Sequence, residues 1–187
     1  MSIQHRDIPD AQLHEPKGAA AAASGAVYVA NGIGGGVWTI GDRYAELYIT
    51  AGVTGLALPA ANAFTRLDPG AEWKAGVASG LTVTPADGTF TIDATGAYSL
   101  SFWATFSTAS LASGTRYNFK YAVNGVVAPR QLSTYKTSNG VDTLSVSATG
   151  LSGFTAGDVV SIYVGGDATS SGTSITVVEA GFNLHKV

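Results

Sequence analysis

Apolar residues occupy every second position from 98 to 106, with mainly polar residues between them, and this pattern restricts the fold more than any other feature. One set of alternate positions holds Tyr98, Leu100, Phe102, Ala104 and Phe106, and the other holds Ser99, Ser101, Trp103, Thr105 and Ser107. A period of two places the two sets on opposite faces of a β-strand. The segment therefore predicts a long strand with one buried face.

The same period recurs in shorter segments from residue 44 onward. Strands are expected at residues 46–50, 64–67, 81–84, 89–92, 116–123, 143–148, 159–164 and 175–184. Turn residues separate them, and Asn124 followed by Gly125 is a strong hairpin signal. Strands that recur at roughly 10–15 residues, with no helix between them, favour an antiparallel all-β sandwich or jelly roll over an α/β fold.

The first 43 residues differ in character from this body. Charged residues, Pro9 and Pro16 crowd into the first 18 positions, and a run of alanines follows at residues 19–23. A segment so polar and so broken by proline cannot bury a core of its own. Residues 27–29 and 37–40 are expected to pair as a short hairpin. The chain is thus expected to comprise an extended N-terminal arm, residues 1–43, and a compact domain, residues 44–187.

Single anchor residues are spaced along the arm, as they would be in a segment that lies on the surface of another protein. The prolines keep the arm extended, which lowers the entropy lost when it docks. The residues expected to make this attachment are Ile8, Pro9, Leu13, His14, Pro16, Val27, Tyr28 and Trp38.

The composition excludes several classes of function. Charged residues make up 12% of the chain, against about 25% in an average domain, and the formal net charge is only -3. Because no cluster of Lys and Arg is present, neither nucleic acid nor a membrane surface is an expected partner. The absence of cysteine excludes disulfides, thiolate zinc sites and a Cys nucleophile. No membrane span or signal peptide is expected, which indicates synthesis in a cytoplasm.

The residues that could carry chemistry give no coherent site. The glycine-rich stretch at 32–36 has Val37 where a dinucleotide fingerprint needs glycine, so a hinge is favoured. His5 and His14 have no known metal spacing, and residues 44–184 contain no histidine for a catalytic triad. Glu179 interrupts an apolar strand and would need a partner if it were buried. No enzymatic activity, cofactor or metal is therefore expected.

The body resembles the jelly-roll family of tumour necrosis factor and the C1q globular domain. The resemblance rests on residues 89–102, 117–125, 154–162 and 175–184, in the order that this family has them. It implies a ten-stranded jelly roll that assembles as a homotrimer. Aromatic residues in excess of what one sandwich core needs would line the contact between copies. The residues expected there are Tyr48, Tyr98, Phe102, Tyr121, Tyr163 and Phe182.

The arm is similar to the N-termini of tailed-bacteriophage virion proteins, on residues 5–10, 13–18, 27–32 and 36–38. This resemblance implies a non-enzymatic structural protein on the outer surface of the virion, as a capsid decoration protein or head fibre. The arm would bind the major capsid protein or another virion protein. The alternative is a tail-associated protein that binds a receptor or a host surface glycan, for which Trp73 or Trp103 could stack on sugar rings. A polysaccharide-degrading enzyme is a third reading and would need two carboxylates across a groove.

Overall fold

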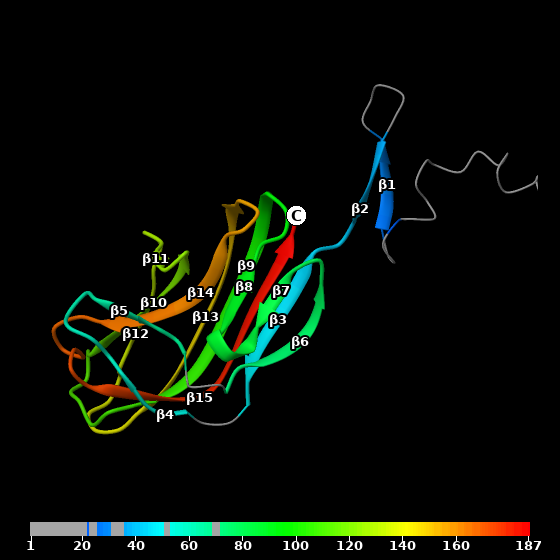
Figure 1. The fold of residues 1–187 in the computed structure, drawn as a ribbon. Coiled ribbons are helices and arrows are strands. Elements are labelled where there is room, and N and C mark those ends of the chain that lie inside the picture. The colour runs from blue at the N-terminus through cyan, green and yellow to red at the C-terminus, as the bar shows by residue number, and fades with distance from the viewer. Residues whose placement is uncertain (1–21, 23–25, 31–35, 51–52, 69–71) are drawn as a thin grey trace, which may run out of the picture. The chain divides into compact units, whose positions relative to one another are not determined.

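A computed structural model describes residues 22, 26–30, 36–50, 53–68 and 72–187 (Figure 1). The chain divides into two compact units, Met1–Gly41 and Asp42–Val187. The attachment residues expected at Ile8, Pro9, Leu13, His14 and Pro16 lie outside the described residues, and their role stays a prediction.

The described part of the first unit is a two-stranded antiparallel hairpin, as the sequence predicts. Strand β1 (Ala26–Ala30) pairs with β2 (Gly36–Ile40), and Tyr28 lies opposite Trp38. Their ring centroids are 5.4 Å apart. The valines of the hairpin are largely exposed, with Val37 at 63%. The hairpin alone therefore leaves apolar side chains uncovered.

The second unit is a sandwich of two antiparallel sheets. The seven-stranded sheet has the order β11 (Val126–Val127), β10 (Arg116–Val123), β14 (Val159–Gly166), β8 (Thr89–Thr91) and β7 (Thr82–Thr84), with β12 (Leu132–Tyr135) on β10 and β5 (Phe64–Arg66) on β14. The six-stranded sheet has the order β13 (Thr143–Phe154), β9 (Gly96–Thr108), β15 (Ser174–Lys186), β3 (Tyr44–Ile49) and β6 (Lys74–Ser79), with β4 (Val53–Ala57) on β15. Consecutive strands repeatedly lie in different sheets, which is the jelly-roll arrangement (Figure 1).

The core lies between the sheets and confirms the alternation read from residues 97–107. The apolar set on β9 is buried, with exposed fractions from 0% at Tyr98 and Phe106 to 8% at Leu100. It packs against β10 of the opposite sheet, where the Phe102 and Phe119 ring centroids are 5.5 Å apart. Strand β14 adds Val160, Ile162 and Val164 at 0–3% exposure. Each sheet therefore contributes one apolar face to a single core.

Candidate functional site

The outer face of β9 and β13 is lined mainly by serine and threonine, with Trp103 and Leu151 as the two large side chains. The strands pair so that Ser99, Ser101, Trp103, Thr105 and Ser107 lie opposite Leu151, Thr149, Ser147, Ser145 and Thr143. Three of these cross-strand pairs join their hydroxyl groups at 3.1–3.2 Å. None of the ten side chains is charged, although a sheet face exposed to water commonly carries long polar and charged side chains. We call this surface the hydroxyl face.

Trp103 is the large aromatic residue of the hydroxyl face, and 38% of it is exposed. Its indole lies over Gly181 of β15, because a Cβ atom on that glycine would overlap Trp103 Nε1. A shallow hollow beside the indole is bounded by Thr105, Ser145 and Ser147. Glu179 lies exposed nearby, where its Oε1 is 3.5 Å from Thr105 Oγ1. The face thus combines an aromatic surface, hydroxyl groups and one carboxylate.

Strand β13 is an edge of the six-stranded sheet. Over its 12 residues, TLSVSATGLSGF, it holds no charged residue and no proline. Sheet edges in soluble proteins are usually protected by charge, by proline or by a covering segment. The opposite edge strand, β6, begins with the exposed Lys74.

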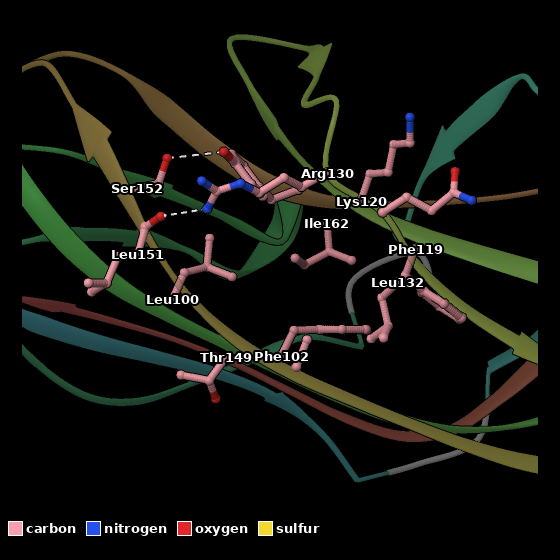
Figure 2. A pocket seen from close by; sticks show the side chains of 14 residues that line it. Leu100, Phe102, Phe119, Lys120, Arg130, Leu132, Thr149, Leu151, Ser152 and Ile162 are labelled. Carbon is pink, nitrogen blue, oxygen red and sulfur yellow. Dashed lines mark hydrogen bonds between the residues drawn. The ribbon is translucent and has the colours of Figure 1, made fainter.

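An apolar crevice opens between β13 and the β10–β12 side of the other sheet (Figure 2). Its volume is about 220 Å³. Its large apolar lining residues include Leu100, Phe102, Phe119, Leu132, Leu151 and Ile162. The two sheets separate here, so core residues border a space that no other part of the described domain fills.

Two polar contacts bridge the crevice between the sheets. Arg130 Nη1 donates to the Leu151 carbonyl at 3.0 Å, and the hydroxyls of Tyr121 and Ser152 are 3.0 Å apart. Figure 2 shows both contacts on the same side of the crevice. Lys120 also lines the crevice, whereas no carboxylate does. The Lys120 Nζ lies over the Phe64 ring, 4.7 Å from its centroid, so Arg130 is the cation at this border. The crevice therefore has an apolar interior and one guanidinium group at its border.

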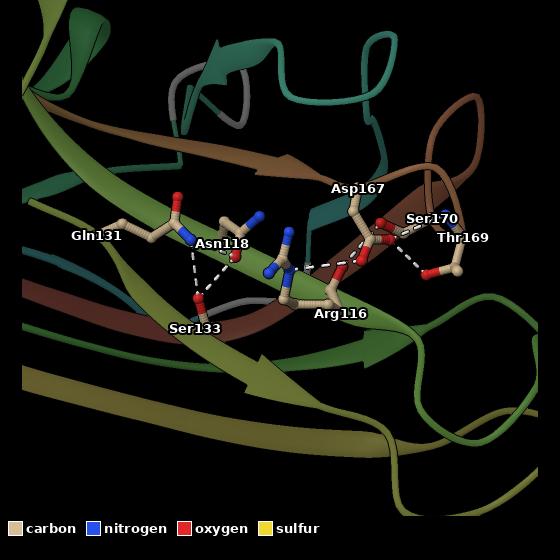
Figure 3. A network of polar contacts seen from close by, with 7 residues as sticks. All are labelled: Arg116, Asn118, Gln131, Ser133, Asp167, Thr169 and Ser170. Atoms are coloured by element: carbon tan, nitrogen blue, oxygen red, sulfur yellow. Dashed lines mark hydrogen bonds and ion pairs between the residues drawn. The ribbon is translucent and has the colours of Figure 1, made fainter. Parts of the chain in front are cut away.

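A polar network on the seven-stranded sheet is structural (Figure 3). Asn118 is 1% exposed, and its Oδ1 accepts hydrogen bonds from Gln131 at 3.0 Å and from Ser133 at 2.7 Å. Arg116 Nε lies 3.4 Å from Asp167 Oδ2. Hydrogen bonds from Thr169 hold the pKa of Asp167 below its ordinary value. The Arg116 contact joins the β14–β15 loop to β10, and the Asn118 contacts join Gln131 and Ser133 to the same strand.

The structure corrects three of the six residues expected between copies. Tyr98, Phe102 and Phe182 are 0%, 4% and 0% exposed and lie in the core of one chain. Tyr98 donates to the Ala94 carbonyl at 2.7 Å, and the Phe182 ring centroid is 4.7 Å from that of Phe90. Their side chains cannot reach a second copy, because alternation marks the buried face of a strand without saying what buries it. The remaining three, Tyr48, Tyr121 and Tyr163, are partly exposed.

The structure also shows how far the other candidate binding residues are exposed. Trp73 is 3% exposed and donates to the Leu67 carbonyl at 2.8 Å, so its ring is not available to a sugar. In the hairpin, Val27 and Tyr28 are exposed and Trp38 is partly buried. Within the described ranges no group of three or more potential metal ligands occurs. In the same ranges no helix has the length and hydropathy needed to cross a membrane.

No pattern in the sequence indicated the crevice beside Leu151 or the space that Gly181 leaves for Trp103. A crevice forms where two strands from different sheets diverge, which no local pattern records. Only the long uncharged run at residues 143–154 could have suggested a covered edge.

The sequence matches no family model and no curated protein. Solved structures do match in fold. The globular domain of zebrafish complement 1qA protein is 13% identical with a TM-score of 0.51, over 78% of this chain and 97% of that one. The tumour necrosis factor Eiger from S. frugiperda is 12% identical with a TM-score of 0.50, over 78% of this chain and 93% of that one. The second unit is therefore a jelly roll of the tumour necrosis factor and C1q type.

Proposed function

We propose that the chain is a non-enzymatic structural protein of a phage particle, attached by its N-terminal unit and displaying the jelly roll as a homotrimer. A capsid decoration protein or head fibre on the outer surface of the virion fits this description. The resemblance of the arm to N-termini of tailed-phage virion proteins supports a location on a phage particle. The jelly-roll fold supports a displayed, self-contained body.

The exposed hairpin is the observation that carries the proposal. A two-stranded hairpin alone is marginally stable in water, because it buries too little apolar surface. Yet Val27, Val29 and Val37 are 46–63% exposed, and Tyr28 is 37% exposed. A hairpin of this kind is stabilised when another protein covers its apolar side chains. The major capsid protein or another virion protein would supply that surface.

A homotrimer would strengthen such attachment. Each arm makes a small contact, and linking three of them turns the second and third binding events into intramolecular ones. Weak single arms then give stable decoration of the particle, provided that the three binding sites match the spacing of the arms.

Binding of the full chain to particles that lack it tests the proposal. Replacing Val27 and Val37 together with serine should weaken co-sedimentation with the particles, since both side chains are exposed anchors. Val77→Ser is the matched control, because Val77 is 69% exposed on β6 of the jelly roll. Residues 1–41 fused to an unrelated trimer should also bind. Equal binding by the hairpin variant and the control would refute attachment through the arm.

Glycan binding by a tail-associated protein is a second candidate, favoured by Trp103 alone. An exposed indole beside hydroxyl groups and the Glu179 carboxylate can stack on a sugar ring and hydrogen-bond to it. Screening the assembled protein against a glycan array, with Trp103→Ala in parallel, tests this function. Binding that depends on Trp103 would favour it over a purely structural role.

A further inference from the structure

The hairpin of β1 and β2 is apolar on both of its faces. Its register places Tyr28 opposite Trp38, and successive residues of a strand point to opposite sides. One face therefore carries the two aromatic rings, and we call it the aromatic face. The other carries Val27, Val29 and Val37, and we call it the valine face.

Both faces remain exposed in the single chain. Tyr28 is 37% exposed, and the three valines are 46–63% exposed. A strand pair at a protein surface usually alternates apolar with polar residues, so that one of its faces meets water. Residues 18–41 contain no charged residue and no proline. Strands that are apolar on both faces are typical of sheets covered on both sides, so this hairpin needs two covering surfaces and not one.

The aromatic face has the shape and charge to pack on a copy of itself. Small and large residues alternate along β1 on this face, as Ala26, Tyr28 and Ala30. The Tyr28 ring lies over Gly36 of β2, where a Cβ atom would come within 2.8 Å of Tyr28 Cε1. Surfaces that alternate large with small residues can interdigitate. Because the face carries no charge, two copies of it do not repel each other.

Resting on the homotrimer proposed above, we propose that the aromatic faces of its three hairpins pack together around the three-fold axis. The occupant of this face is then the hairpin of a second copy, and the valine face remains for the particle. Hairpins tethered to one assembled body meet at an effective concentration on the order of millimolar. A hairpin that is marginal alone gains a buried face from this contact. The arm thereby holds the copies together as well as attaching them.

Crosslinking in the full chain tests the contact, and the absence of cysteine from the sequence provides a clean background. Ala30→Cys places a thiol on the aromatic face and keeps both rings, whereas Val29→Cys places one on the valine face. Both positions are exposed neighbours on one strand and share the same tether. A bismaleimide that spans about 10 Å, the spacing of packed sheets, should join copies through Ala30→Cys. The rate should exceed that of Val29→Cys by about tenfold, since random encounters at one effective concentration would give equal rates.

A second substitution in the Ala30→Cys chain tests which face carries the contact. Tyr28→Ser should slow the crosslinking to about the rate of Val29→Cys, because it removes a ring from the aromatic face. Val37→Ser is the matched control and should leave the rate unchanged, since Val37 lies on the opposite face. The rate should not change when the protein is diluted, as long as sedimentation shows the homotrimer.

The outcomes separate the hairpin contact from the proposals on which it rests. A homotrimer in which both cysteines react at equal rates would mean that the hairpins collide without packing, and would overturn the contact alone. Faster reaction through Val29→Cys would overturn the choice of face, and crosslinking that needs bound particles would make the particle the cause. A monomer at micromolar concentration would overturn both the contact and the homotrimer. Attachment to particles is measured separately, so its failure would leave these rates unaffected.

Discussion

The indole of Trp103 lies over the backbone of Gly181, on the neighbouring strand of the same sheet. The two residues are directly paired between β9 and β15. A Cβ atom at position 181 would overlap Nε1 of the indole and lie 2.5 Å from Cε2. The glycine therefore makes room for the tryptophan to lie along the sheet.

Gly181→Ala should reduce the free energy of unfolding by about 1–2 kcal/mol, because the added methyl group forces the indole from its position. Urea denaturation at fixed protein concentration measures this change. In a Trp103→Ala background the same substitution should cost much less, since nothing then lies over position 181. If Gly181→Ala reduced the free energy of unfolding equally in both backgrounds, the loss would come from the backbone at position 181 and not from the indole.

Phe182→Ala should destabilise the domain by about 3–5 kcal/mol, as expected for removing a buried aromatic ring. Phe182 is fully buried against Phe90. Tyr163→Ala is the comparison, because Tyr163 is only partly buried. This substitution should reduce the free energy of unfolding by about 1–2 kcal/mol. Denaturation measured over a range of protein concentrations separates core loss from lost association. If Phe182→Ala weakened association without reducing folding stability, Phe182 would lie in the contact between copies and not in the core.

Lys136→Met should cost about 1–3 kcal/mol of folding stability, because it removes two hydrogen bonds that a buried ammonium group donates. Lys136 is 2% exposed, and its Nζ donates to Thr108 Oγ1 at 2.9 Å and to the Gly140 carbonyl at 2.7 Å. Lys74→Met, at an exposed lysine, should change stability by less than about 0.5 kcal/mol. Thermal or urea denaturation of the two variants provides the comparison. Equal stabilities of the two variants would show that the buried ammonium group contributes nothing to folding stability.

Stability should fall with acidification below about pH 4. Hydrogen bonds from Ser138 and Thr169 are the main causes that lower the pKa values of Asp142 and Asp167 from the ordinary 3.8. Because the folded-state pKa lies below the unfolded one, this stabilisation is complete above the unfolded pKa. It is lost as the pH falls through the folded pKa. The urea midpoint measured from pH 6 to pH 2 should show the loss, and Ser138→Ala should make it smaller.

Alkaline pH should destabilise the domain through its buried tyrosines. Burial is the main cause that raises the pKa values of Tyr98 and Tyr117 above the ordinary 10.0. The unfolded chain then releases these protons at a lower pH than the folded chain. Stability is therefore complete below about pH 10 and is lost as the pH rises through the folded-state pKa values. Tyrosinate absorbance and the urea midpoint, followed together, should change in the same pH range.

The sequence predicted the fold wherever a strand has one buried face. The strand expected at 116–123 agrees with β10, and the alternation at 97–107 lies within β9. Strand β13 shows the limit of this reasoning, because it was expected only to residue 148 and continues to Phe154. Residues 147–151 are exposed as the strand passes beside the crevice. A strand segment with no buried face leaves no alternation to read.

The candidate site was less predictable than the fold. Trp103 was expected to point away from the core, and it does. Its support from Gly181 depends on the register of β15 against β9, which includes an irregularity between Val177 and Glu179. The crevice depends on the distance between two sheets, and this distance is set by side chains far apart in sequence. The local periodicity of the sequence predicts neither the register between strands nor the distance between sheets.

Removal of residues 1–41 should leave folding of the jelly roll nearly unchanged. Asp42–Val187 form a compact unit of their own, and its core residues run from Ala45 to Leu184. The first strand of the body, β3, is held by β15 through a continuous register from Ala180 to His185. Because these contacts lie within the second unit, the truncated chain should melt within about 4 °C of the full chain, a shift of no more than roughly 1 kcal/mol.

The same truncation should abolish attachment to particles, since the hairpin with Val27 and Val37 is removed. Self-association should persist, because the proposed homotrimer forms through the jelly-roll body, Asp42–Val187. Calorimetry, sedimentation and particle binding on one preparation measure the three properties together. A truncated chain that fails to fold would place the arm in the core of the molecule. A truncated chain that binds particles as tightly as the full one would move the attachment site to the jelly roll.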